Sequence, residues 1–293
     1  MKKDKSVERD KLLTRILFVA LIVGLIIFFY PMVSNWWNDR VTSKAVATYD
    51  AAVANLVEDD YSAYFEAAEE YNAKLAEIGS ASALLKPEIA GEEYWELLDV
   101  TGTGVMGYIT IEKIGVQLPI YHGTDSGVLQ VAAGHLQGSS LPVGGESTHA
   151  VISAHRGLPS AKLFTDLDDL EVGDTFTITI LGEVFTYEVD KISIVLPSEA
   201  ENLYIEEGKD YVTLMTCTPY GINSHRLLVR GTRIDSSESK IIYVTADAYK
   251  VDSIIVAPFI AIPILFVLLI VLLVTTHRKK SKKRKKSDNR RSE

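Results

Sequence analysis

Two apolar segments frame this chain of 293 residues and constrain its fold more than any other feature. Residues 16–33 and 254–274 contain no charged side chain, and each segment is long enough to cross a bilayer. Lysines and arginines precede the first segment and follow the second, and such positive flanks stay on the cytoplasmic side of a membrane. The sequence therefore predicts two transmembrane helices, at 16–33 and 254–276. A basic N-terminus (1–15) and a basic tail (277–293) would be cytoplasmic, and the residues between the spans would be extracellular.

A cleavable signal peptide is the alternative interpretation of the first segment. No small-x-small cleavage site follows its core, and residues 30–37 contain a tyrosine and two tryptophans instead. Aromatic residues of this kind collect at the membrane–water interface, so an uncleaved anchor is favoured. In the second segment, Pro258 and Pro263 would weaken a soluble helix, but proline is tolerated in membrane spans.

The net charge of −9 conceals an uneven distribution of charge. Residues 34–253 contain 14 Lys and Arg against 34 Asp and Glu, a balance of −20. An acidic region of this kind argues against nucleic-acid binding. The basic tail directly follows an apolar span, and it is explained as a topology signal that also attracts anionic lipid. One cysteine excludes an internal disulfide, but about 220 residues are enough to form a core without one.

Between the spans, the spacing of apolar residues changes once. From residue 37 to about residue 78, apolar side chains recur three or four positions apart, which indicates an amphipathic helical region. We expect a helical stalk that lies back on the following domain and ends at Gly79 and Ser80. The stalk and the residues after it make up a first region, 34–103.

From residue 104 onwards the apolar period is two, as in β-strands. Residues 160–170 form one helix-like insert, and a linker (236–253) leads to the second span. Many short strands with one helical insert predict a mainly β barrel or sandwich over residues 104–235. The strand-like runs lie at 106–111, 116–121, 148–154, 175–181, 184–195, 211–217 and 225–234.

Cys217 is the only cysteine, and it ends one of the predicted strands. A lone strand cysteine is usually a small buried hydrophobe, and it becomes a nucleophile only beside a base or a positive charge. Arg226 opens the next strand after a turn that contains proline and glycine, so a hairpin would bring the two side chains together. His155 ends the strand at 148–154, where a side chain can reach a cleft. The pattern therefore favours a catalytic thiol.

The other histidines are weaker candidates for the base. His149 lies six residues before the strand end, about 20 Å away along an extended chain, and is expected to be structural. His225 faces the opposite side of its strand from the neighbouring arginine. His122 and His135 lie in turn-like stretches, where a solvated or locally hydrogen-bonded ring is usual. No cluster of Cys, His and Asp has the spacing of metal ligands.

Three blocks of this sequence resemble the class C, pilin-polymerising sortases of Gram-positive bacteria. One block reads Thr-Leu-Met-Thr-Cys at 213–217, in the family's Thr-Leu-x-Thr-Cys form, and continues to residue 231. The other two blocks are residues 153–165 and 106–124, and the resemblance covers roughly residues 40–235. It implies an eight-stranded sortase-type β-barrel with an N-terminal helical extension, flanked by the two transmembrane helices.

The resemblance also implies a reaction. Sortases are cysteine transpeptidases that cut a Leu-Pro-x-Thr-Gly-like sorting signal between Thr and Gly through a thioacyl intermediate. Class C members transfer the acyl group to a lysine amine of a pilin subunit. By this similarity His155, Cys217 and Arg226 are the catalytic residues. The implied partners are pilins or surface proteins with a C-terminal sorting signal, together with membrane lipid, and no cofactor, metal or nucleic acid is implied.

The same resemblance implies where the sorting signal binds. The loop at 197–209, before the cysteine strand, would help to form the pocket, with Pro197 and Leu203 as candidate contacts. Thr216 is a further candidate because its hydroxyl is next to the cysteine and could support an oxyanion site. Simple packing is the alternative for a threonine within a strand.

One segment departs from the family's pattern. Class C sortases commonly carry an Asp-Pro-aromatic lid over the arginine and the cysteine, and the corresponding residues here are Lys86, Pro87 and Glu88. Lys86 would repel Arg226, and Glu88 has no ring to cover the sulfur atom. A carboxylate–arginine contact in an exposed cleft is worth about 0–1 kcal/mol, which is too little to hold a loop shut. We therefore expect residues 84–91 to be mobile or folded aside, leaving the thiol accessible.

Three alternatives stand beside this interpretation. A papain-like protease has its cysteine early, at a helix start, and its histidine later, which is the reverse of the order here. A non-enzymatic adhesion or scaffold domain tethered to the membrane explains the spans and the acidic region, but not the histidine, cysteine and arginine. Within the sortases, a housekeeping enzyme that anchors surface proteins to cell-wall peptide is the alternative. The second span and the helical stalk favour the pilin class over that enzyme.

Overall fold

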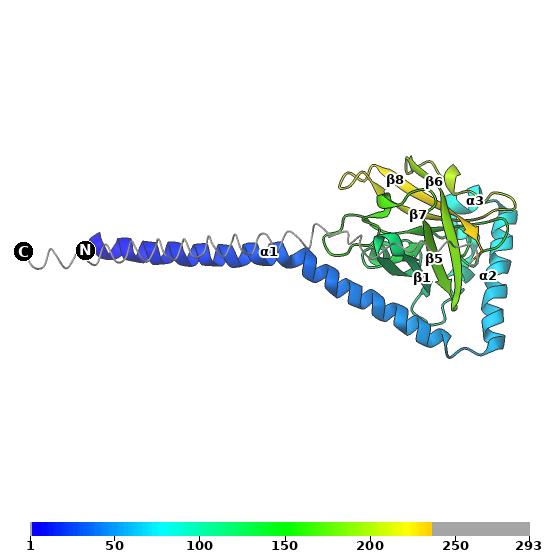
Figure 1. The fold of residues 1–293 in the computed structure, drawn as a ribbon, viewed down its shortest axis with the longest axis horizontal. Helices are drawn as coiled ribbons and strands as arrows, with labels where there is room; N and C mark the ends of the chain where they lie inside the picture. Colours follow the sequence, from blue (N-terminus) through cyan, green and yellow to red (C-terminus); the bar gives the residue numbers. More distant parts are fainter. Residues whose placement is uncertain (1, 236–293) are drawn as a thin grey trace, which may run out of the picture. The chain divides into compact units, whose positions relative to one another are not determined.

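The computed structural model describes residues 2–235 (Figure 1). The second apolar segment, predicted to span a membrane at 254–276, lies outside the described residues, as do the linker and the basic tail. The described residues fall into two units, 2–32 and 33–235, and each is treated by itself.

Helix α1 (Lys2–Val53) contains the first apolar segment. From Thr14 onwards it is long and apolar enough to cross a membrane, and its most apolar window has a mean hydropathy of 2.8 with 0% of it buried. Within residues 2–235 it is the one helix of this kind. The segment predicted at 16–33 is therefore helical and exposed, a property that membrane anchors share with signal sequences.

The predicted amphipathic region contains two helices. The chain leaves α1 after Val53 and forms α2 (Glu58–Ile78). As expected, α2 ends at Gly79, which has a φ of +88° and donates its N–H to the carbonyl oxygen of Leu75. A short third helix then starts at once, which the sequence pattern did not indicate. It is α3 (Ser80–Leu85), followed by the 3-10 turns η1 (Pro87–Ala90) and η2 (Glu92–Trp95).

Eight strands close into a mixed barrel, as the resemblance implied, and their order is β1-β2-β3-β4-β7-β8-β6-β5. Figure 1 labels β1, β5, β6, β7 and β8 of this barrel. The β2–β3 and β4–β7 pairs are parallel, and the other pairs are antiparallel. The interior is filled by buried apolar side chains, among which Phe176 stacks on Tyr187 with their ring centroids 5.6 Å apart. The strands are β1 (Val105–Ile111), β2 (Val116–His122), β3 (Ala133–His135), β4 (Thr148–Ser153), β5 (Thr175–Ile180), β6 (Glu183–Val195), β7 (Asp210–Thr218) and β8 (His225–Ile234).

Buried polar side chains attach the helices to the barrel. Tyr49 of α1 is 1% exposed, donates its hydroxyl to the Met106 carbonyl oxygen at 2.9 Å and accepts the Leu181 N–H at 2.8 Å. Asn72 of α2 exchanges two hydrogen bonds with the backbone of Leu141. Figure 1 shows α2 running alongside the barrel. Because buried hydrogen bonds fix register as well as distance, these contacts hold the helical region against the barrel.

Two local predictions were wrong. The apolar pattern gave seven strands, and it missed β3, whose three residues are too few to show a period. The insert at 160–170 is not a helix: it consists of turns with one 3-10 element, η4 (Leu167–Asp169). Leu163 there has a φ of +44°, which no right-handed helix allows. The apolar side chains of the insert are buried against the barrel core. Their spacing in the sequence resembles that of a helix because they pack on the core, and not because the backbone is helical.

Candidate active site

Cys217 and Arg226 lie directly opposite each other on the paired strands β7 and β8. Adjacent antiparallel partners have side chains within contact range on the same face of a sheet. Cys217 is a free cysteine of intermediate exposure, so solvent reaches it. The hairpin therefore pairs Cys217 with Arg226 across the two strands, the register that its sequence predicts.

The guanidinium of Arg226 is held by backbone and not by an acid. Its Nη1 donates to the carbonyl oxygens of His225 at 3.1 Å and Asn223 at 3.4 Å. Within residues 2–235, no carboxylate forms an ion pair with it. Its positive charge is thus available to a neighbouring negative group.

His155 follows the end of β4, which pairs in parallel with β7. Ser153 pairs with Met215, the Ala154 N–H donates to the Met215 carbonyl oxygen at 3.2 Å, and the Thr216 hydroxyl donates to the Ala154 carbonyl oxygen at 2.9 Å. His155 comes one residue after Ala154, and Cys217 comes one residue after Thr216, so the two candidates follow hydrogen-bonded neighbours at adjoining backbone positions. The imidazole is half-buried.

The other histidines have different surroundings. His122 and His135 are 5% and 0% exposed, so their turn-like sequences did not leave them in solvent. The ring of His122 lies between the carbonyl oxygens of Gly104 and Leu97, and burial lowers the pKa of His135 to about 3. The two rings hold loops to the barrel.

His149 is also buried, as a structural histidine should be. Its Nδ1 donates to the Tyr204 carbonyl oxygen at 2.9 Å, and its Nε2 accepts the Thr213 hydroxyl at 2.7 Å. Burial, the largest cause, lowers the pKa of His149 from 6.5 to about 4, although the bond to Tyr204 opposes that shift. The neutral ring therefore joins β4 to the loop before the cysteine strand.

That loop, residues 197–209, makes several other hydrogen bonds and an ion pair that the sequence did not indicate. Arg230 of β8 binds Glu206 at 3.0 Å, besides its pair with Asp190. The Ile205 N–H donates to the Ser80 hydroxyl at 3.0 Å. Lys191 and Ser147 also bind the loop. The loop is consequently preformed by its bonds to strands and to α3.

The three candidate sorting-signal contacts have unequal exposure. Thr216 is 1% exposed and its hydroxyl is engaged with the Ala154 carbonyl oxygen. Leu203, in η5 (Glu201–Leu203), is 8% exposed and belongs to a second apolar cluster with Val151, Val195 and Leu228. Pro197 is on the surface.

The segment equivalent to the family's lid is helical. Leu84 of α3 packs on the second apolar cluster, whereas Lys86 and Glu88 are exposed. In the described part of the chain, neither of these charged side chains forms an ion pair with Arg226. Packing of Leu84 holds the start of the segment, and its predicted mobility stays a prediction.

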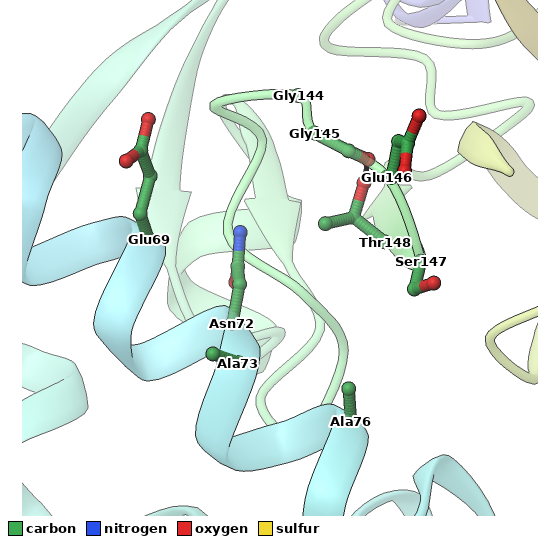
Figure 2. A pocket seen from close by; sticks show the side chains of 9 residues that line it. All are labelled: Glu69, Asn72, Ala73, Ala76, Gly144, Gly145, Glu146, Ser147 and Thr148. Carbon is green, nitrogen blue, oxygen red and sulfur yellow. Dashed lines mark hydrogen bonds between the residues drawn. The ribbon is translucent and has the colours of Figure 1, made fainter. Parts of the chain in front are cut away.

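A cavity of about 150 Å³ lies between α2 and the segment 144–148 (Figure 2). Figure 2 shows Glu69, Asn72, Ala73 and Ala76 of α2 facing that segment. None of the catalytic candidates lines it. Residues 2–235 contain no group of three or more His, Cys, Asp or Glu side chains that could hold a metal ion.

Comparison with known proteins agrees with this architecture. The family described as Sortase domain matches residues 109–234. Sortase C1 from Streptococcus agalactiae is 48% identical, with a TM-score of 0.60 over 66% of this chain and 98% of that one. Sortase C of Streptococcus pneumoniae is 42% identical, with a TM-score of 0.58 over 66% and 97% of the two chains.

Sortase D of Bacillus subtilis is 31% identical over 44% of this chain and 63% of its own length. The chain spans less than two thirds of the curated relatives that it matches. The closed barrel and the identity to solved sortase C chains together define the class of the fold, a sortase-type barrel. The chain belongs to the sortase family, on its class C branch.

The depressed pKa of His149 predicts that acid destabilises the fold. Between pH 6.5 and about 4 the unfolded chain binds a proton at this ring and the folded chain does not, so stability falls as the pH falls through that window. His149 should account for a loss of about 3 kcal/mol between pH 7 and pH 4. Denaturant unfolding of the full chain in detergent at several pH values measures it.

The matched variants are His149→Gln and His225→Gln. His149→Gln lowers stability at pH 7 and should reduce the slope of stability on the acid side, of which the buried His135, whose pKa is also lowered, keeps a part. His225→Gln, at the half-exposed start of β8, is the control variant. An unchanged slope in His149→Gln would mean that this ring does not govern the acid response.

Proposed function

We propose that this chain is a membrane-anchored transpeptidase that polymerises pilins. It cleaves a Leu-Pro-x-Thr-Gly-like sorting signal between Thr and Gly, through a thioacyl intermediate on Cys217. It then transfers the acyl group to a lysine amine of a pilin subunit. The observation that carries this proposal is the pairing of Cys217 with Arg226 across β7 and β8, next to the end of β4.

In this proposal Cys217 acts as a thiolate that attacks the carbonyl carbon of the Thr–Gly bond. The C–S bond forms as the C–N bond breaks, and His155 protonates the departing glycine amine. In the second half, His155 takes a proton from the incoming lysine amine, which attacks the thioester and releases the thiolate. One half-exposed imidazole can serve both steps because both substrates approach from solvent.

Arg226 is proposed to stabilise negative charge on the substrate. Its fixed charge and planar set of N–H donors suit a developing oxyanion or a substrate carbonyl oxygen. Binding to two backbone carbonyl oxygens fixes one edge of the guanidinium and leaves other donors free. Lack of a carboxylate partner in residues 2–235 keeps the charge from being neutralised before substrate arrives.

The loop at 197–209 is proposed to form one wall of the sorting-signal pocket. Pro197 is exposed and can touch substrate directly, whereas Leu203 and Thr216 shape the wall from behind. The loop's bonds to Arg230, His149 and Ser80 support a preformed wall, which lowers the entropic cost of binding a peptide.

The pilin class is favoured over a housekeeping anchor by the relatives. Solved sortase C chains are 42–48% identical to this one over nearly their whole length, and one of those structures is described in terms of pilin substrate specificity. A sortase A from Streptococcus agalactiae is 33% identical over 47% of its length. The exposed apolar part of α1 supports a membrane anchor, and we propose the second span at 254–276 with both termini cytoplasmic.

Cys217→Ala should abolish covalent transfer and leave the barrel folded, because it removes the nucleophile and only a sulfur atom of volume. The measurement is the appearance of covalent pilin ladders in cells that carry this variant alone, with unchanged thermal unfolding of the purified chain. Ladders that persist in such cells would contradict the proposal.

Arg226→Lys should lower kcat by on the order of 10²-fold, because lysine keeps the charge but loses the planar set of donors. Arg233→Lys, at the far end of the same strand, is the matched control and should keep the wild-type kcat. Near-normal turnover by Arg226→Lys would mean that charge alone suffices and that the geometric role is wrong.

A further inference from the structure

The chain leaves the barrel sheet at Ala154, so His155 stands at the start of a turn and not within the strand ladder. Contacts from the following loop hold one side of this turn. The Phe164 N–H donates to the His155 carbonyl oxygen at 3.1 Å, and the Gly157 N–H donates to the Thr165 hydroxyl at 3.1 Å. These bonds fix the turn to its own loop, but they do not fix it to the hairpin that carries the thiol.

Tyr220 supplies a contact from the hairpin side. It lies in the turn between β7 and β8, three residues after Cys217. A Cβ atom added to Gly157 would lie 2.8 Å from Cε2, 3.0 Å from Cζ and 3.2 Å from Cδ2 of the Tyr220 ring. The ring therefore rests directly on the backbone of Gly157, which also needs glycine for its φ of +73°.

Arg156 completes this contact. Its guanidinium carbon lies 5.9 Å from the centroid of the Tyr220 ring, within the range of a cation–π interaction. The Arg156 side chain is 10% exposed and forms an ion pair with Asp168. The Tyr220 ring thus contacts Arg156 and Gly157, the two residues that follow His155. In the sequence it lies only three residues after Cys217.

We propose that Tyr220 is a positioning residue that holds the turn of His155 against the hairpin of Cys217. This inference rests on the proposed function, since it assigns the ring to the alignment of imidazole and thiol. Tyr220 itself is 61% exposed, so its side chain contributes little to the core. Removing it should alter alignment more than stability.

Small displacements of a catalytic group have large effects on a reaction rate. A shift of about 1 Å in a catalytic group can reduce a rate by up to about 10²-fold. Loss of the ring leaves in place the bonds of the turn to Phe164 and Thr165 and those of Ala154 to β7, so a partial effect is expected. Because ring carbons make the contacts with Gly157 and the ring face meets Arg156, phenylalanine should replace tyrosine.

The test compares Tyr220→Ala, Tyr220→Phe and the control Ile222→Ala, using the full chain in detergent and a peptide that carries the sorting signal. Ile222 lies in the same turn and is 71% exposed. We expect kcat of Tyr220→Ala to fall about tenfold, with KM changed less than twofold. Tyr220→Phe and Ile222→Ala should match the wild type, and all four should unfold at similar temperatures.

Each other result overturns the inference. A wild-type kcat in Tyr220→Ala means that the ring is not needed. A change confined to KM means that it binds substrate. A loss in Tyr220→Phe equal to that in Tyr220→Ala means that the hydroxyl, and not the ring, is required.

A second readout needs no sorting signal, and so separates this inference from the proposed function. The rate of Cys217 alkylation is measured against pH in the wild type, Tyr220→Ala and His155→Ala. If the wild type transfers no peptide, the proposed function fails, but the inference still requires the Tyr220→Ala profile to move toward that of His155→Ala. Coincidence of the Tyr220→Ala profile with the wild-type profile would overturn the inference.

Gly157→Ala tests the contact itself. The added methyl group should displace the ring and the turn, and lower kcat. Combined with Tyr220→Ala, the loss should be smaller than the product of the two separate losses, because the clash disappears with the ring. A double variant whose loss equals that product would show that the two residues do not act together.

Discussion

Strand β7 is hydrogen-bonded on both sides, in parallel to β4 and antiparallel to β8. These two ladders fix the register of three strand ends at once. The antiparallel ladder sets Arg226 opposite Cys217. The parallel ladder ends at Ser153 and Met215, two residues before His155 and Cys217, and we propose that these backbone bonds bring the thiol, the imidazole and the guanidinium into one site.

Part of this arrangement could be predicted from the residues. The contact between Cys217 and Arg226 is local, because a short turn joins their strands and an antiparallel hairpin leaves few registers. The parallel neighbours β4 and β7 are separated by more than fifty residues, and such a pairing leaves no local pattern. The strand-end position of His155 made it a candidate base, its catalytic role was implied by the family resemblance, and its place beside the thiol stays a prediction.

The predictions that were wrong have related causes. Strand β3 is stabilised by hydrogen bonds to its neighbouring strands, and its three residues are too few to show an alternating pattern. The turns at 160–170 contain apolar side chains because they cover the core. For His122 and His135 the sequence left a solvated or a locally hydrogen-bonded ring open, and their burial depends on segments that meet only in the fold. The anchoring of the loop at 197–209 by Arg230, His149 and Ser80 likewise depends on residues that meet only after the barrel closes.

The central claim is that Cys217 carries the acyl group, and peptide mass spectrometry tests it most directly. The full chain in detergent is incubated with a peptide that contains a Leu-Pro-x-Thr-Gly signal, without an amine acceptor, and then acidified and digested. The account predicts an added mass equal to that of the peptide up to its threonine minus one water, attached at Cys217 and released by hydroxylamine. Cleavage of the peptide without such an adduct, or an adduct at another residue, would contradict it.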